Sequence, residues 1–195
     1  MNYKLAKRFI LDTLAKELNP HLTYHGQHHT LDVLRTTTAL CLKESIDAHH
    51  TALLKTAALY HDSGFTVSNV EHEKEGCIIA RTHLPKFGYS NADIELICGM
   101  IMATKIPQSP QNLMEQILCD ADLDYLGRPD FYSIGQSLFE ELSYFKVVNN
   151  EQDWNRIQVR FLEAHHFFTS TNMTNRNPNK QVYLQELKHL VASYG

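Results

Sequence analysis

Residues 53–64, LLKTAALYHDSG, join a run of apolar, helix-forming residues to a His-Asp pair. Leu54, Ala58 and His61 lie at positions i, i+4 and i+7, so we expect the imidazole of His61 to share the buried face of a helix. Gly64 is predicted to end this helix just beyond the pair. Polar side chains directed into a helical core need a partner, because the burial of an unpaired polar group is costly. A metal ion and a hydrogen bond to a nearby carbonyl group would each satisfy that need.

Apolar residues recur at helical spacing along most of the remaining chain, and no segment alternates for long enough to require a strand. Asp47 is the expected N-cap of the helix that ends at the His-Asp pair. We predict connections at 63–68, 105–112 and 169–179, the last because it is polar and rich in asparagine. The sequence therefore predicts an all-α fold, with helices over residues 3–18, 30–44, 48–62, 71–84, 92–104, 113–122, 131–145, 151–168 and 180–193.

Length and composition indicate one globular domain over residues 1–195, of which 43% are hydrophobic. The net charge of −4, with both signs interspersed, argues against a nucleic-acid polymer as a partner. Apolar runs of membrane-spanning length and a signal peptide are both missing, so we expect a cytoplasmic protein with no membrane partner. Four widely spaced cysteines in apolar runs are expected to be free, buried and reduced: Cys41, Cys77, Cys98 and Cys119.

Twelve histidines are an unusual number for this length, and they weaken any argument from His61-Asp62 alone. With ten aspartates present, chance supplies about 0.6 such dipeptides, so the pair needs support from other residues. His29 near the start of the second helix and Asp122 at the end of the sixth provide it. Two imidazoles and two carboxylates from three helix ends would suit Mn, Fe, Co, Ni, Mg or Zn. Four ligands on a six-coordinate ion leave about two positions for water or substrate.

Three stretches resemble, in order and spacing, the signature of the HD superfamily of metal-dependent phosphohydrolases. They are residues 24–29 (YHGQHH), His61-Asp62, and residues 121–123 (ADL). The pattern Tyr-His-x-x-x-His is most similar to the cyclic-nucleotide phosphodiesterase branch, although Gly26 stands where that branch usually has asparagine. The resemblance covers about residues 22–130, and it implies a compact multi-helix bundle to which helices of about residues 131–195 are added.

The resemblance also implies roles for individual residues. His29, His61, Asp62 and Asp122 would be the metal ligands, and Asp62 would also orient the attacking water. His25 would donate a proton to the leaving oxygen. One bound ion is expected. Whether a second ion binds more weakly through Asp62 is left open.

Other residues compete for these roles or could extend the site. His28 is the alternative ligand to His29, while Asp120 and Asp124 are the alternatives to Asp122. His72, Lys105 and Arg128 are candidates for substrate binding, although each is also explained as an ordinary exposed polar residue.

We therefore expect a metal-dependent phosphohydrolase that cleaves a small phosphate ester, first of all a nucleotide or cyclic-nucleotide phosphodiester, by a metal-bound hydroxide. A phosphomonoesterase or nucleotidase, and a nucleotide-sensing regulatory domain with little turnover, are the alternatives. A helical interaction module in which the histidines are incidental is a further one. The expected partner is a small-molecule substrate, and assembly into a homo-oligomer stays open.

Overall fold

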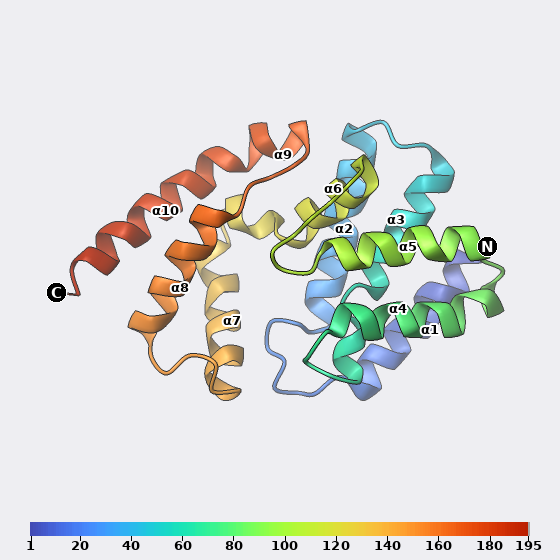
Figure 1. Cartoon of the computed structure of the whole chain (residues 1–195), viewed down its shortest axis with the longest axis horizontal. Helices are drawn as coiled ribbons and strands as arrows, with labels where there is room; N and C mark the ends of the chain where they lie inside the picture. The colour runs from blue at the N-terminus through green and yellow to red at the C-terminus, as the bar shows by residue number, and fades with distance from the viewer. Residues whose placement is uncertain (195) are drawn as a thin grey trace. The chain divides into compact units, whose positions relative to one another are not determined.

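A computed structural model describes residues 1–194, and in this range the chain forms ten α-helices, three short 3-10 helices and no strand (Figure 1). The predicted all-α fold class is confirmed. The α-helices are α1 (Tyr3–Glu17), α2 (Gln27–Lys43), α3 (Ala48–Tyr60), α4 (His72–His83), α5 (Asn91–Ala103), α6 (Leu113–Asp122), α7 (Phe131–Tyr144), α8 (Glu151–Ala164), α9 (Ser170–Asn175) and α10 (Asn177–Ala192). The 3-10 helices are η1 (Ser63–Thr66), η2 (Leu84–Phe87) and η3 (Asp124–Gly127).

The chain divides into two compact units. The first contains residues 1–20 and 25–122, with helices α1 to α6. The second contains residues 21–24 together with the chain from residue 123 onward, with helices α7 to α10. The expectation of a single domain over residues 1–195 stays a prediction.

Helix α3 is the centre of the first unit, where it packs against α1, α2, α5 and α6. It is apolar on nearly all sides, as expected for a helix that is surrounded by others. Complete burial of each leucine in it stabilises the fold by about 1.5–3 kcal/mol. The helix therefore brings the residues that follow it, His61 and Asp62, into the interior. Its fully buried side chains are Leu53, Leu54, Thr56, Ala57, Ala58, Leu59 and Tyr60.

The two ends of α3 differ in how well the sequence predicted them. Asp47 is the N-cap as expected, and its carboxylate accepts hydrogen bonds from the backbone N–H groups of His49 and His50 at 2.9 and 3.0 Å. The prediction that Gly64 ends the helix is wrong, because α3 ends at Tyr60 and Gly64 lies inside η1. A Cβ atom at Gly64 would lie 1.9 Å from the carbonyl oxygen of His72. Gly64 is thus needed for the close packing of η1 against α4.

The second unit corrects two sequence-based boundaries. Helix α8 ends at Ala164 rather than near residue 168, and the predicted connection at 169–179 instead contains α9 and the start of α10. The hydroxyl of Thr169 caps α9 by accepting a hydrogen bond from the N–H of Asn172 at 3.2 Å. Pro178 lies in the first turn of α10, where its missing N–H is tolerated.

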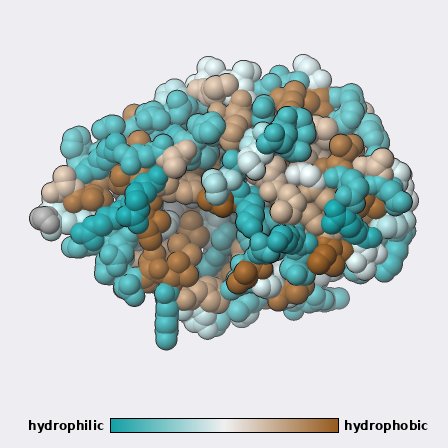
Figure 2. Space-filling view, viewed as in Figure 1, coloured by the Kyte–Doolittle hydropathy of each residue, from teal (hydrophilic) through white to brown (hydrophobic). Residues whose placement is uncertain are grey.

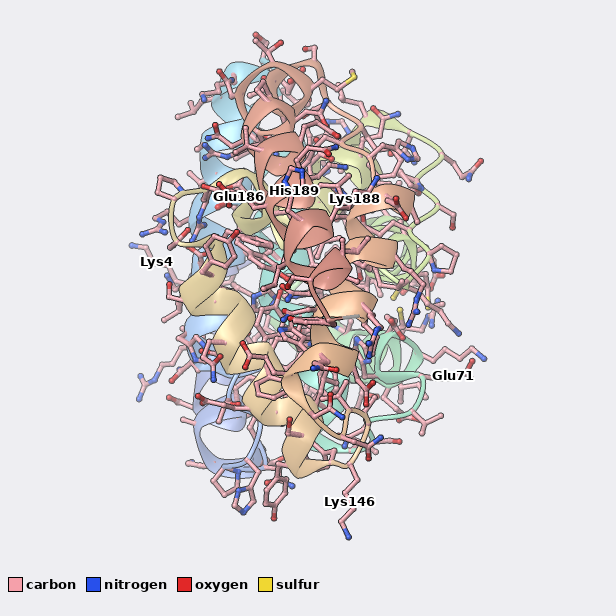
Figure 3. All side chains as sticks on the ribbon, turned by 90° about the vertical axis from the view of Figure 1, so that its left-hand side faces the viewer. Lys4, Glu71, Lys146, Glu186, Lys188 and His189 are labelled. Atoms are coloured by element: carbon pink, nitrogen blue, oxygen red, sulfur yellow. The ribbon has the colours of Figure 1, made fainter. Side chains whose placement is uncertain are left out.

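The buried charged side chains in this part of the chain have hydrogen-bond partners. Asp124 accepts hydrogen bonds from Asn172 at 3.2 Å and from the guanidinium of Arg176 at 2.7 Å. Lys180 is buried, and its ammonium donates to the carbonyl of Leu162 at 3.2 Å, near the C-terminal end of α8. Lys188 on α10, labelled in Figure 3, also pairs with Glu163 of α8, at 2.7 Å.

Polar and apolar residues are interspersed on the face of the protein shown in Figure 2. Single apolar side chains such as Leu42 and Val70 are exposed. Among the described helices, none is both long and apolar enough to span a bilayer. All four cysteines are free and buried, as the sequence predicts.

Candidate metal centre

Three helix ends place the predicted ligands close together in the first unit. Helix α2 begins at Gln27, three residues earlier than expected, so that His29 lies in its first turn. His61 follows the last residue of α3, and Asp122 is the last residue of α6. Because α2 packs against both α3 and α6, these ends meet.

Four donor atoms form what we call the four-donor site: His29 Nε2, His61 Nε2, Asp62 Oδ2 and Asp122 Oδ1. His29 Nε2 lies 3.0 Å from Asp122 Oδ1 and 3.4 Å from Asp62 Oδ2. His61 Nε2 lies 3.1 Å from Asp62 Oδ2 and 3.4 Å from Asp122 Oδ1. The two Nε2 atoms are 3.3 Å apart. The structure thus brings His29, and not its exposed neighbour His28, to this cluster.

The separations within the trio His29, His61 and Asp122, 3.0–3.4 Å, fit the ligands of one divalent cation, and Asp62 Oδ2 lies at similar distances from the two imidazoles. Donor atoms about 2.1 Å from one ion lie about 3.0 Å apart at a right angle and about 3.4 Å apart at the tetrahedral angle. Asp62 Oδ2 is buried and accepts no hydrogen bond from any residue in the described range 1–194. A cation would satisfy this oxygen, whose burial without a partner is otherwise costly.

The orientation of His61 also suits a ligand. Its Nδ1 lies 2.9 Å from the carbonyl oxygen of Ala58, which can only accept a hydrogen bond. The proton of the neutral imidazole is therefore on Nδ1, and the lone pair of Nε2 is directed toward the four-donor site. His61 is 1% exposed, so its ring has little freedom to reorient.

Electrostatics in the metal-free site favour ionised carboxylates. Burial alone would lower the pKa of His61, but the charges of Asp62 and Asp122 outweigh it and raise that pKa well above its ordinary value. Burial would raise the pKa of Asp122, yet hydrogen bonds from His29 and His61 hold it at about 2. Asp62 likewise has its pKa held well below the ordinary range, against burial, by His61. The raised pKa of His61 means that a proton on its imidazole partly balances these carboxylates.

Three aromatic rings, His25, Phe65 and His72, form what we call the histidine mouth beside the four-donor site. The ring of His25 lies 6.1 Å from that of His29, and His72 Nε2 is 3.5 Å from Asp62 Oδ1. Phe65 contacts both, with centroids 4.4 Å from His25 and 3.9 Å from His72. The structure thus places the candidates His25 and His72 beside the predicted ligands.

Two residues of this region were missed by sequence reasoning. Phe65 was assigned to a connection, and no feature of its residue type indicates that η1 turns it toward the two imidazoles. Glu73 is buried, and its Oε1 lies 3.4 Å from His72 Nε2. It was missed because it stands in the charged run EHEKE, which is typical of a solvated helix face.

The other candidates are engaged elsewhere. Lys105 donates to Glu71 at 2.9 Å on the exposed surface of the first unit (Figure 3 labels Glu71). Arg128 belongs to the second unit, where its guanidinium bonds to Asp130 at 2.9 and 2.6 Å. Their roles in substrate binding stay predictions. Of the alternative aspartates, Asp120 is fully buried and Asp124 binds Arg176 within the second unit.

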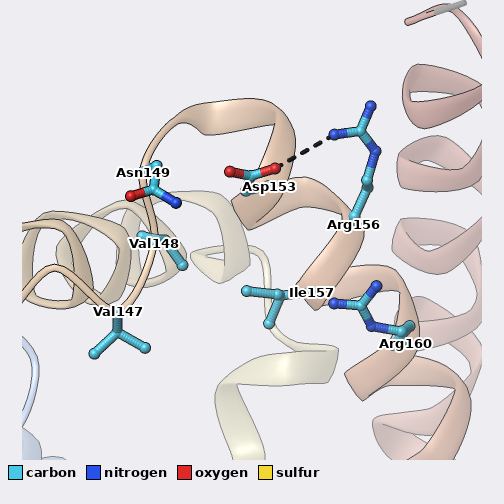
Figure 4. A pocket seen from close by; sticks show the side chains of 7 residues that line it. All are labelled: Val147, Val148, Asn149, Asp153, Arg156, Ile157 and Arg160. Carbon is cyan, nitrogen blue, oxygen red and sulfur yellow. Dashed lines mark hydrogen bonds and ion pairs between the residues drawn. The ribbon is translucent and has the colours of Figure 1, made fainter.

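A separate hollow of about 250 Å³ lies in the second unit, between the α7–α8 connection and the first turns of α8 (Figure 4). Within it, Arg156 pairs with Asp153 at 3.4 Å. It contains none of the predicted site residues. Its lining residues are Val147, Val148, Asn149, Asp153, Arg156, Ile157 and Arg160.

The family model of the HD domain matches residues 26–124, just over half of the chain. The chain belongs to the HD domain family. The matched range contains all four residues of the four-donor site, and it begins one residue after His25. The HD resemblance predicted from the sequence is therefore confirmed at the level of the family, whereas the phosphodiesterase-like branch stays a proposal.

A solved structure shares this fold. The crystal structure of a predicted HD superfamily hydrolase from an uncultured Thermotogales bacterium aligns with 96% of this chain and 92% of its own, with a TM-score of 0.62 and 20% sequence identity. At this identity the likeness shows the HD fold alone. Comparison with the curated proteins gave no significant match.

Proposed function

We propose that this HD domain protein is a metal-dependent phosphohydrolase that cleaves a small phosphate ester. A nucleotide or cyclic-nucleotide phosphodiester is the first substrate class to test. The observation that carries this proposal is the four-donor site, in which the two imidazole nitrogens lie 3.3 Å apart and each lies 3.0–3.4 Å from both carboxylate oxygens. Two nitrogens and two oxygens suit a divalent ion of the Mn, Fe, Co, Ni, Zn or Mg type.

His29, His61, Asp62 and Asp122 would hold the ion. When bound, a divalent cation lowers the pKa of a coordinated water and offsets negative charge on phosphoryl oxygens. The side chain of Asp122 is 14% exposed, whereas that of His61 is 1% exposed. Asp122 thus marks the side from which substrate and water can approach.

The remaining steps belong to residues of the chain. Asp62 would orient the attacking water through a carboxylate whose second oxygen, Oδ1, lies 3.5 Å from His72. His25, at the mouth, would donate a proton to the leaving oxygen. An imidazole suits this role because its ordinary pKa is close to neutral pH.

Elemental analysis of the purified protein, followed by a substrate screen, tests the proposal. We expect about one transition metal ion per chain, lost in His61→Ala, since one four-donor site holds one ion. A second ion would have to use Asp62 Oδ1 as a ligand. A measured content of two ions per chain would indicate such a second site. A folded, metal-free wild-type protein that is active without added divalent ions would overturn the proposal.

The screen should compare phosphomonoesters, cyclic mononucleotides and dinucleotides at equal concentration. Turnover of monoesters alone would assign a phosphomonoesterase or nucleotidase to the same residues. Stoichiometric metal and tight nucleotide binding without turnover would instead assign a regulatory, nucleotide-sensing domain. A cytoplasmic location and an assembly of several copies are further proposals, which fractionation and light scattering would test.

A further inference from the structure

Phe65 joins the two histidines of the mouth, although neither its residue type nor its position in the sequence suggested a role. Its ring stacks on His72 with centroids 3.9 Å apart and an interplanar angle of 19°. It also contacts His25, with centroids 4.4 Å apart and an angle of 32°. Aromatic rings at these distances attract one another beyond the effect of simple burial. Three separate segments are thereby linked: the residues before α2, η1, and the first residue of α4.

The backbone that presents Phe65 is held tightly. The N–H of Phe65 donates to the carbonyl of Asp62 at 3.1 Å, and the hydroxyl of Ser63 donates to the carbonyl of Tyr60 at 2.7 Å. Gly64 packs so closely on α4 that a Cβ atom there would overlap the carbonyl of His72. The backbone of η1 therefore holds the ring of Phe65 in place, and the half-buried imidazoles of His25 and His72 pack against this ring.

The two imidazoles that Phe65 contacts are suitably spaced for one tetrahedral anion. Their centroids are 6.2 Å apart. A phosphate group between these rings could accept a charge-assisted hydrogen bond of about 2.8 Å from one nitrogen of each imidazole. His72 Nε2 lies 3.5 Å from Asp62 Oδ1 and 3.4 Å from Glu73 Oε1, so an anion bound by His72 would lie beside the four-donor site.

We propose that Phe65 is a positioning residue that fixes His25 and His72 so that both bind the phosphate group of the substrate. His25 would contact the leaving oxygen and His72 a non-bridging oxygen. This inference rests on the proposed function and deepens it, because it assigns the phosphate-binding part of the site.

Binding of inorganic phosphate to the Mn²⁺-loaded full-length protein tests the proposal without requiring turnover. Titration calorimetry would compare wild type with Phe65→Leu, Phe65→Tyr and the control Phe87→Leu. Phe87 is a matched control because it is also half-buried, also lies in a 3-10 helix of the first unit, and contacts Phe9 rather than the mouth. We expect phosphate to bind about tenfold more weakly to Phe65→Leu, since two aromatic pairs are lost.

Metal content and melting temperature distinguish a positioning role of Phe65 from a role in packing alone. Phe65→Leu should keep its Mn²⁺, Phe65→Tyr should restore phosphate affinity, and Phe87→Leu should lose stability but no affinity. Equal phosphate affinity in Phe65→Leu and Phe87→Leu, or no phosphate binding by wild type, would overturn the proposal. Wild type that binds phosphate but hydrolyses no ester would reject the proposed function while the role of Phe65 stands.

Discussion

At the scale of single residues, the four-donor site depends on charge as much as on shape. Asp122 and Asp62 are held ionised at neutral pH by the imidazoles around them, so that two negative charges face the position of the cation. A neutral side chain of the same size would keep the packing but would leave the cation only partly neutralised. The ligand residues can thus be tested by substitutions that hardly change their volume.

Asp122→Asn should weaken metal binding by at least about 100-fold, because loss of even an outer partner of a ligand costs 10- to 100-fold. Helix content should be unchanged, since amide and carboxylate differ little in size. Competition with a chelator, read by elemental analysis, would measure the change. Asp12→Asn on exposed α1 is the control. An unchanged affinity in Asp122→Asn would show that Asp122 is not a ligand.

Gly64→Ala should lower the free energy of unfolding by about 1–3 kcal/mol, the usual cost of overpacking, because its Cβ would lie 1.9 Å from the carbonyl oxygen of His72. Gly99→Ala in α5 is the control, since its Cβ would meet only Glu115 Oε1, at 3.4 Å. Urea unfolding of both variants would measure the difference. If Gly64→Ala is as stable as Gly99→Ala, the close packing of η1 on α4 is wrong.

The sequence was sufficient to identify residues whose chemistry is unusual in a core. His29, His61, Asp62 and Asp122 were predicted as ligands because imidazoles and carboxylates beside apolar residues at helix ends need a partner, and because their order and spacing resemble the HD signature. Phe65 and Glu73 could not be found in this way. An aromatic ring in a connection and a glutamate in a charged run are ordinary, and their positions depend on how η1 and α4 pack.

At the scale of elements, amphipathic helices were predicted well, and short polar ones were not. Helix α6 has the predicted bounds, Leu113–Asp122, because apolar spacing and a preceding proline-containing connection define it. Helix α9 was missed because its composition is that of a connection. Thr169 and Asn172 serve there as a cap and as a partner for buried Asp124, roles that composition does not reveal.

Thr169→Val should reduce the free energy of unfolding by about 1 kcal/mol, the typical worth of an N-cap. Valine keeps the shape of threonine but cannot accept the hydrogen bond from Asn172. Thr174→Val, at an exposed position of the same helix, is the control and should have little effect. Chemical denaturation followed by circular dichroism would measure both. Equal stability of the two variants would contradict the capping role.

At the scale of the whole molecule, protons and the proposed metal ion would compete for the same atoms. The folded pKa of His61 is raised, so its contribution to the stability of the metal-free protein is complete below about pH 6.5 and is lost as pH rises through the folded pKa. The folded pKa of Asp122 is lowered to about 2, so its contribution is present above its ordinary value of 3.8 and is lost as pH falls toward 2.

The metal ion should therefore stabilise the protein more at pH 8 than at pH 5.5, because imidazole ligands must lose their protons before they bind it. Thermal melts with and without added Mn²⁺, at a series of pH values, would measure the increase in melting temperature. His61→Ala should show little increase at any pH. A shift that is as large at pH 5.5 as at pH 8 would contradict this competition.

Residues 21–24 belong to the second unit, although they directly precede His25 in the chain. There the N–H of Tyr24 donates to Glu141 of α7 at 2.8 Å, and the hydroxyl of Thr23 donates to the carbonyl of Ser137 at 2.8 Å. During synthesis, the four residues of the four-donor site leave the ribosome before Ser137 and Glu141 of α7 do, because they precede them in the chain. We expect a nascent chain to be able to take up the proposed ion first, and the backbone next to His25 to become fixed only once α7 has folded.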